Sequence, residues 1–295
     1  MSKAYQVITD QIIELLEQGT VPWRQPWISV APQNLITCRA YRGINPFILA
    51  CRGFSSPFWL TFRQAKQLGG SVRKGQRSAP VVFWKIHKKE DEESQEEAQT
   101  VSVPVLRYYR VFNVEQCEGL PEERIPVIEE REFAPLEIAE KIVAGMPGPP
   151  EIRHGATAAL YLPAKDRVEL PRPTCFESSH QYYCTLFHEL THASGSKGRL
   201  GRLGGKTPAP FGSADYSREE LVAEMGAAFL CGECGIEQST LENSAAYISH
   251  WLQRLKSDPR LAVIAAAQAQ KAADFILGRH QPNGKEKAQA TAKAV

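Results

Sequence analysis

His188-Glu189-Leu190-Thr191-His192 is the stretch that decides the fold of the second half of this 295-residue chain. It has the form H-E-x-x-H, with a glutamate directly after the first of two histidines. On an α-helix, residues four positions apart lie on one face, so both imidazoles can bind one metal ion. The glutamate then lies beside the ion, where it can act as a general base. The motif predicts a metal site with His188 and His192 as ligands and Glu189 as the catalytic base.

The residues around the motif predict a helix over 178–193. This segment contains neither Pro nor Gly, and Ser178 or Ser179 can cap its N-terminus. Its apolar residues follow helical spacing, and Gly195 is expected to end the helix. Short strands are expected before this helix, around 152–153, 159–162 and 167–169.

A third ligand is expected from residues 217–231, another strongly helical stretch. Glu220 and Glu224 lie on the border of its apolar face, where an ionised carboxylate needs a partner. A catalytic zinc site has three protein ligands and one open position. We predict Glu220 as the third ligand and Glu224 as the residue that orients a ligand histidine. If Ser217-x-x-Glu220 were a capping box, Glu220 would be occupied and Glu224 would be the ligand instead.

The predicted ligands favour Zn²⁺, although Mn²⁺ or another divalent cation can bind the same set of donors. If the site is catalytic, we expect peptide or amide hydrolysis. Glu189 would take a proton from water and later deliver it to the leaving amine. Tyr216 and Tyr247 are candidates to stabilise the oxyanion. The single C-x-x-C at 231–234 is interpreted as the end of a helix.

Charge is unevenly distributed along the chain. Residues 1–89 contain 13 Lys and Arg against three acids, a net charge of +10, which leaves −8 for the remainder of a chain whose total is +2. Such a division predicts a polyanionic partner for the first part. The same 89 residues contain 11 aromatic side chains, including four of the five Trp. Cations interleaved with flat rings are typical of surfaces that bind single-stranded nucleic acid.

The predicted DNA-contacting residues come from these basic and aromatic clusters. The expected partner is single-stranded DNA, and duplex DNA is a second option. The alternative for each ring is a place in the core of a small domain, with the cations solvated. The predicted residues are Trp23, Arg24, Trp27, Arg39, Tyr41, Arg42, Trp59, Arg63, Lys66, Arg73, Lys74 and Arg77.

The chain is long enough for two domains. Helices are expected at 4–18, 45–52 and from Thr61 onward, and strands at 80–85 and 105–114. Two more helices, at 240–257 and 259–278, are expected to complete the second domain. We predict an α+β fold with a small N-terminal DNA-binding domain over 1–120, an acidic loop at about 89–100, a linker over 121–134, a second domain over 135–280 and a disordered tail over 281–295.

The chain has no apolar run as long as a membrane span, and Met1–Gln18 lacks the features of a secretion signal. Its seven cysteines are irregularly spaced, which is typical of proteins in a reducing compartment. We therefore expect a cytoplasmic protein without a membrane partner.

Several segments resemble the ArdC-type antirestriction proteins, which are encoded on conjugative plasmids. The segments are GINPFIL (43–49), FWLTFRQAKQLGGSVRKGQ (58–76), YYRVFNVEQ (108–116), HELTHASG (188–195), RLGR (199–202) and YSREELVAEMGAAFL (216–230). The resemblance implies a single-stranded-DNA-binding domain followed by a zincin-like metallopeptidase domain. By position it implies His188, His192 and either Glu220 or Glu224 as metal ligands, with Glu189 as the base.

The family function implied by this resemblance is protection of incoming plasmid DNA from the recipient's restriction enzymes. Two hypotheses follow. In the first, the protein coats the entering single strands and the metal domain is accessory. In the second, it is a metallopeptidase brought to DNA, where it cleaves a restriction subunit or another DNA-bound protein.

Overall fold

A computed structural model describes residues 3–24, 31–90, 100–127, 135–203, 213–236 and 245–279. The chain divides into two compact units, of which unit 1 comprises residues 1–132 and 239–267 and unit 2 comprises residues 133–238 and 268–295. Each unit combines helices with a β-sheet. The predicted α+β class with two domains is therefore confirmed.

Unit 1 is built on a four-stranded sheet with the strand order β1-β2-β5-β4 and a separate two-stranded sheet of β3 and β6. Its helices cover the larger sheet and flank the smaller one. The strands are β1 (Gln33–Asn34), β2 (Phe58–Leu60), β3 (Ser71–Val72), β4 (Ala79–Glu90), β5 (Thr100–Asn113) and β6 (Cys117–Glu118); the helices are α1 (Lys3–Glu17), α2 (Asn45–Ala50), α3 (Phe62–Gln67) and α7 (Ala245–Ser257), with the 3-10 turns Pro22–Arg24, Val114–Gln116 and Glu122–Arg124.

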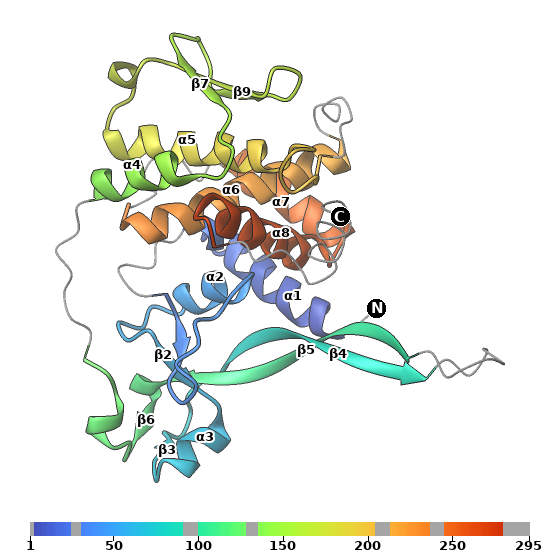
Figure 1. The fold of residues 1–295 in the computed structure, drawn as a ribbon. Helices are drawn as coiled ribbons and strands as arrows, with labels where there is room; N and C mark the ends of the chain where they lie inside the picture. The colour runs from blue at the N-terminus through green and yellow to red at the C-terminus, as the bar shows by residue number, and fades with distance from the viewer. Residues whose placement is uncertain are drawn as a thin grey trace, which may run out of the picture. The chain divides into compact units, whose positions relative to one another are not determined.

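Strands β4 and β5 pair in antiparallel register from Ala79↔Val111 to Glu90↔Thr100 and form a long two-stranded ribbon (Figure 1). Both strands are longer than the sequence predicted. One face of the ribbon packs against α1, and Val82 and Leu106 are buried there. On the opposite face Val81 belongs to a core cluster with residues of α2 and β2. The ribbon is thus anchored at one end by packing on both faces.

Local signals in the sequence explain the helices of unit 1. The apolar side of α1 is buried at Ile8, Ile12 and Leu16, as an amphipathic helix requires. Helix α3 begins with the predicted capping box. The Thr61 hydroxyl accepts a hydrogen bond from the Gln64 amide, and the Gln64 side chain accepts one from the Thr61 amide.

Unit 2 contains a three-stranded sheet with the order β7-β9-β8, in which β7 and β9 are parallel and β8 and β9 antiparallel. Helix α4 lies beside α5 and α6 (Figure 1). The strands confirm those expected before the metal-site helix. The elements are α4 (Pro135–Gly145), β7 (Glu151–His154), β8 (Leu160–Leu162), β9 (Arg167–Leu170), the 3-10 turn Pro173–Cys175, α5 (Ser179–Ser194) and α6 (Ala214–Cys234).

The two last helices are expected in the second domain, and this assignment stays a prediction; by their contacts they divide between the units. Helix α7 belongs to unit 1, and the division between the units falls within α8 (Leu261–Ile276). The reason is local packing. The Trp251 ring of α7 meets the Trp23 ring edge-on with centroids 5.8 Å apart, and Lys256 Nζ lies 3.2 Å from Glu17 Oε1 of α1.

The predicted domain boundaries at residues 120, 134 and 280 stay predictions. Residues 91–99, 128–134 and 280–295 lie outside the described residues, and with them most of the acidic loop, the second half of the linker and the tail. Among the helices that the structure describes, none has both the length and the apolar character needed to cross a membrane.

Helices α5 and α6 approach each other closely at Gly226. A Cβ atom on Gly226 would lie 2.5 Å from Cγ2 and 2.7 Å from Oγ1 of Thr191, much closer than a normal contact. Thr191 is fully buried, and its hydroxyl donates a 2.7 Å hydrogen bond to the Phe187 carbonyl, so its side chain cannot simply move aside. The absence of a side chain at residue 226 therefore sets the separation of the two helices.

We predict that Gly226→Ala lowers the free energy of unfolding by about 1–3 kcal/mol, because the added methyl group overpacks this crossing. Urea denaturation followed by circular dichroism measures the change. Gly145→Ala is the matched control, since a Cβ at the end of α4 meets nothing within 4 Å. In the Thr191→Ala/Gly226→Ala double variant the losses should be less than additive. Strictly additive losses would contradict a steric clash between these residues.

Candidate functional site

Helix α5 has the expected start and end. The Ser178 hydroxyl accepts a 3.2 Å hydrogen bond from the Gln181 amide, which confirms Ser178 as the N-cap. Gly195 follows the last helical residue, but its φ of −78° is one that any residue adopts. Glycine is needed there for space, because a Cβ would lie 2.9 Å from Leu203 Cγ and 3.0 Å from Arg202 Nη2.

Helix α6 begins earlier than the predicted residue 217. Ser213 is its N-cap and accepts a 3.1 Å hydrogen bond from the Tyr216 amide. Ser217 therefore lies inside the helix, where its hydroxyl donates to the Ser213 carbonyl at 3.0 Å. The alternative capping box at Ser217 is wrong, and Glu220 is not engaged by it.

Cys231 and Cys234 are buried in the last turn of α6, as the interpretation of the C-x-x-C as a helix end predicts.

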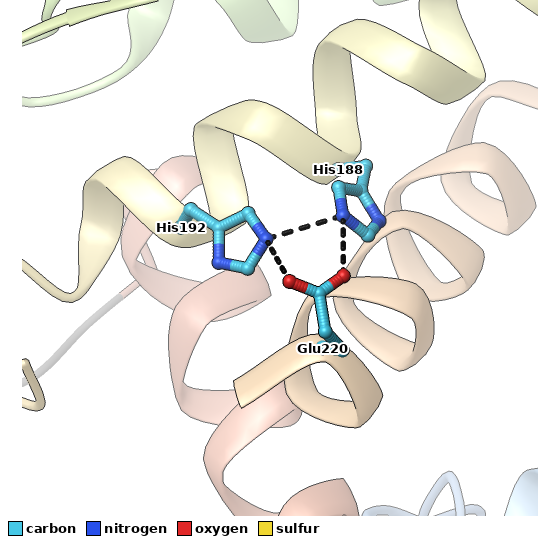
Figure 2. Close-up of side chains that lie close together, drawn as sticks. All are labelled: His188, His192 and Glu220. Atoms are coloured by element: carbon cyan, nitrogen blue, oxygen red, sulfur yellow. Dashed lines mark hydrogen bonds and ion pairs between the residues drawn. The ribbon is translucent and has the colours of Figure 1, made fainter. Parts of the chain in front are cut away.

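His188 and His192 on α5 and Glu220 on α6 point toward one another (Figure 2). The two Nε2 atoms are 3.1 Å apart, and Glu220 places one oxygen 3.6 Å from His188 Nε2 and the other 3.6 Å from His192 Nε2. One ligand atom from each residue lies within 4.8 Å of the others. Glu224 is described by the structure but is not part of this cluster.

This arrangement fits a divalent metal ion. Ligand atoms about 2.0–2.1 Å from a tetrahedral ion lie roughly 3.3 Å from one another, close to the spacing of these three groups. Two imidazole nitrogens and one carboxylate oxygen are also a donor set that zinc and manganese accept. The geometry favours Glu220 over Glu224 as the third ligand, and the ligand roles of these residues remain predictions.

The electrostatics of the cluster favour charge on His188 and Glu220. Burial alone would lower the pKa of His188, but its hydrogen bond to Glu220 and the charges of Glu189 and Glu220 raise it above the usual value. The charge of Glu224 acts on His188 in the same direction. Burial would raise the pKa of Glu220, yet the hydrogen bond with His188 and the charges of both histidines lower it. Glu220 is therefore held as a carboxylate.

Glu219 orients the second histidine from the side opposite the cluster. Its Oε1 lies 3.2 Å from His192 Nδ1, and Arg202 binds its two oxygens at 2.7 and 2.9 Å. Burial alone would raise the pKa of Glu219, but the hydrogen bonds from Arg202 and His192 lower it. Arg202 also donates a 2.8 Å hydrogen bond to the Thr191 carbonyl. This pair, called the Glu219–Arg202 clamp below, holds the His192 ring at Nδ1 so that its Nε2 faces Glu220. Metal-binding imidazoles are usually held in this way through their other ring nitrogen.

Glu219 and Arg202 are not among the residues predicted from the sequence. The orienting role predicted for Glu224 stays a prediction, and Glu219 adds a contact to His192. Adjacent residues on a helix point in directions about 100° apart, so Glu219 and Glu220 reach opposite nitrogens of one imidazole. The sequence contains two signals for these residues, namely the Glu-Glu pair at 219–220 and the second Arg of the segment RLGR.

Glu189 and Tyr216 lie close to the ligand cluster. Glu189 is buried on α5 between the two histidines. Burial raises the pKa of Tyr216, and so do the charge of Glu220, its hydrogen bond to Tyr216 and the charge of Glu189. The Tyr216 hydroxyl is thus protonated beside both carboxylates. The side chain of Tyr247, the other predicted oxyanion group, lies outside the described residues.

The predicted DNA-contacting residues fall into two groups. All seven cations whose side chains are described are exposed: Arg39, Arg42, Arg63, Lys66, Arg73, Lys74 and Arg77. The rings of Trp23, Tyr41 and Trp59 are buried, with exposed fractions of 1%, 5% and 2%. Their prediction as base-contacting rings is wrong, because α7, α2 and the sheet enclose them. The side chain of Arg24 and all of Trp27 lie outside the described residues.

We predict that Glu220→Gln lowers metal affinity by roughly 100-fold or more, above the 10- to 100-fold loss typical of outer hydrogen-bonding partners. The reason is that the neutral amide oxygen of Gln is a weaker metal ligand than the charged carboxylate oxygen of Glu. Isothermal titration with Zn²⁺ and with Mn²⁺ measures the affinity. The matched variant Glu224→Gln, one turn along the same helix, should bind metal almost as the wild type does. The reverse ranking would make Glu224 the third ligand.

A second prediction concerns the clamp on His192. Glu219→Gln should weaken metal binding by roughly 10- to 100-fold, since the imidazole loses its charged partner. Arg202→Lys should give a smaller loss, because Lys cannot bind both oxygens of a carboxylate in a planar fork. Metal titration and thermal unfolding should be measured on the same samples. A loss of stability without any loss of metal affinity would reduce the clamp to a structural role.

Comparison with known proteins links both units to described families. Residues 2–112 match the N-terminal domain of anti-restriction factor ArdC, and residues 137–269 match a zincin-like metallopeptidase. The protein is similar to the uncharacterized protein y4eC of Sinorhizobium fredii, with 36% identity over 92% of this chain and 91% of that protein. It is also 34% identical to two DNA primase TraC proteins of Escherichia coli, over 99% and 96% of this chain but only 28% and 20% of theirs.

Two solved structures are similar along almost the whole length. A metal-free crystal structure of the antirestriction ArdC protein from the R388 plasmid has 37% identity and a TM-score of 0.74, covering 95% of this chain and 100% of that one. Its Mn(II)-bound form has 38% identity and a TM-score of 0.72, covering 93% and 97%. With an ArdC N-terminal domain, a zincin-like domain carrying a cluster suited to a divalent metal, and relatives that match from end to end, this chain belongs to the ArdC-type antirestriction proteins.

Proposed function

We propose that this protein binds single-stranded DNA through unit 1 and protects incoming conjugative plasmid DNA from restriction in the cytoplasm of the recipient. The observation that carries this proposal is the net charge of +10 over residues 1–89, together with the exposure of all seven predicted cations whose side chains are described. Exposed Lys and Arg replace the counterions of a phosphate backbone, and this release drives binding.

The relatives support the same proposal. The solved protein is named for antirestriction and comes from a plasmid, and the two longer relatives are named as DNA primases. Entering plasmid DNA offers both the charge and the exposed bases that a basic surface with aromatic rings recognises. Duplex DNA would offer charge alone, so we expect weaker binding to it.

We further propose Zn²⁺ as the resident metal, held by His188, His192 and Glu220. Two imidazoles and one carboxylate are a frequent catalytic zinc set, which supports this choice. The Mn(II)-bound form of the R388 protein supports manganese as the alternative. When bound, such an ion polarises a carbonyl and makes water more acidic.

A second candidate function is a metallopeptidase brought to DNA, with a restriction subunit or another DNA-bound protein as its substrate. The surroundings of Glu189 favour it. Glu189 is buried beside the histidine pair, where its carboxylate can take a proton from water and return it to the leaving amine. Tyr216 is held protonated near Glu189 and Glu220, so its hydroxyl can donate to a developing oxyanion.

The experiment compares two variants for transfer of an unmodified plasmid into restricting and non-restricting recipients. Glu189→Gln removes the base but preserves the shape of the site. Arg63→Glu/Lys66→Glu/Lys74→Glu reverses exposed charge on unit 1. We expect Glu189→Gln to protect the plasmid as the wild type does and the charge-reversed variant to lose protection. Zn²⁺ content and thermal unfolding check that both variants are folded.

The opposite result would favour the peptidase. If Glu189→Gln abolished protection while the charge-reversed variant retained it, the DNA-binding proposal would fail. Loss of protection in both variants would require the base as well as the charge, and would support a peptidase delivered by DNA binding.

A further inference from the structure

The β4–β5 ribbon of unit 1 carries large aromatic rings on its surface. Phe83 is 44% exposed and Tyr109 is 46% exposed, although both lie on paired strands next to the core. Neighbouring rings in the same unit, such as Trp23 and Trp59, are almost completely buried. The two exposed rings lie side by side, and adjacent exposed apolar groups often mark a surface that a partner covers.

Alternation along the strands places these two rings on one face. Phe83 pairs with Arg107, and Val81 pairs with Tyr109, so the four side chains project from the same side of the ribbon. Near the core, residues of α2 and β2 cover this face of the ribbon, and Val81 is fully buried. Two residues further along β4 the covering ends, and Phe83 is exposed.

The exposed rings are held in place by their neighbours. The Phe83 and Tyr109 centroids are 5.8 Å apart, with an interplanar angle of 61°. On its other side, Phe83 lies 6.0 Å from the ring of the buried residue Tyr41. Tyr41 was predicted to contact bases, and its position gives it a supporting role instead. Rings fixed in this way lose little conformational entropy when a flat ligand binds.

Positive charge surrounds the two rings. Arg107 and Lys85 are both exposed on this face, and neither forms an ion pair with any side chain that the structure describes. Residues 79–85 and 105–113 contain no acid. Flat rings beside exposed cations suit a flexible polyanion with exposed planar groups. Single-stranded DNA has this chemistry, whereas a duplex hides its base faces by stacking.

We propose that Phe83 and Tyr109 form the base-stacking platform for single-stranded DNA, with Arg107 and Lys85 binding the adjacent phosphates. This inference rests on the proposed DNA-binding function and adds a base-stacking site on the β4–β5 ribbon to the exposed cations of unit 1. Stacking recognises any base, so binding through this platform is tolerant of sequence.

The other face of the same ribbon provides matched controls. Trp84 is 49% exposed on that face, where its ring lies 6.3 Å from the Tyr5 ring of α1. Arg110 is exposed there as well and bonds to the Ser78 hydroxyl at 3.2 Å. Trp84→Ala and Arg110→Ala therefore remove a comparable ring and a comparable charge from the opposite side.

The test measures binding of the full chain to fluorescent oligo-dT by anisotropy over a range of salt concentrations. Phe83→Ala and Tyr109→Ala should each weaken binding by roughly 5- to 100-fold, the loss of one stacked base. Tyr109→Phe should bind as the wild type does. Arg107→Ala should reduce the slope of log K against log salt by about 0.7, the contribution of one phosphate. Trp84→Ala and Arg110→Ala should leave affinity and slope unchanged.

An abasic oligonucleotide of the same length separates stacking from charge. It should bind the wild type and Phe83→Ala equally, because it has no bases to stack. Circular dichroism and thermal unfolding verify each fold. If Phe83→Ala is unstable, Phe83→Leu retains the apolar contact and takes its place, and it should still weaken binding to oligo-dT.

The outcomes distinguish this inference from the proposed function. Tight, salt-dependent binding by the wild type and equally tight binding by Phe83→Ala and Tyr109→Ala would overturn the platform and leave DNA binding intact. No binding of oligo-dT by the wild type would overturn DNA binding itself. Tighter binding to oligo-rU than to oligo-dT would assign the platform to RNA and overturn the choice of DNA.

Discussion

The close crossing of α5 and α6 at Gly226 is the constraint on which the cluster of His188, His192 and Glu220 depends. Neither helix can form the ligand cluster alone, since α5 supplies two imidazoles and α6 supplies the carboxylate. A side chain at Gly226 would collide with Thr191, one residue before His192. Because protein interiors are closely packed, a small increase in helix separation would carry Glu220 away from both histidines. The arrangement of this cluster is therefore a consequence of helix packing as much as of residue identity.

A second constraint is the grouping of several charges in a partly buried space. The charges of Glu189, Glu220 and Glu224 act on His188. Glu219 forms a hydrogen bond with His192. Such a group is stable only if each carboxylate has a cationic partner. Arg202 provides one for Glu219, while the histidines provide one for Glu220. In the Glu219–Arg202 clamp, Arg202 comes from the loop after α5, which explains why a Gly is needed at 195, where the guanidinium passes the helix end.

In unit 1 the aromatic residues divide into two roles that composition alone does not separate. Trp23, Tyr41 and Trp59 fill the core and support the sheet, whereas Phe83 and Tyr109 stand on the outside of the ribbon. Phe83 and Tyr109 share one face of β4 and β5 with the buried Val81, and they lie where the cover over that face ends. The core ring of Tyr41 contacts the surface ring of Phe83.

The sequence by itself determined what depends on local spacing: the helix that carries His188 and His192, the Ser178 cap, the Thr61 capping box and the concentration of positive charge in the first 89 residues. Only the tertiary structure decided that Glu220 lies beside both histidines, that Glu219 and Arg202 contact one another at His192, and which rings are exposed. The physical reason is that periodicity acts between neighbours in the chain. Proximity and burial depend instead on how elements far apart in sequence pack, and no local pattern encodes that packing.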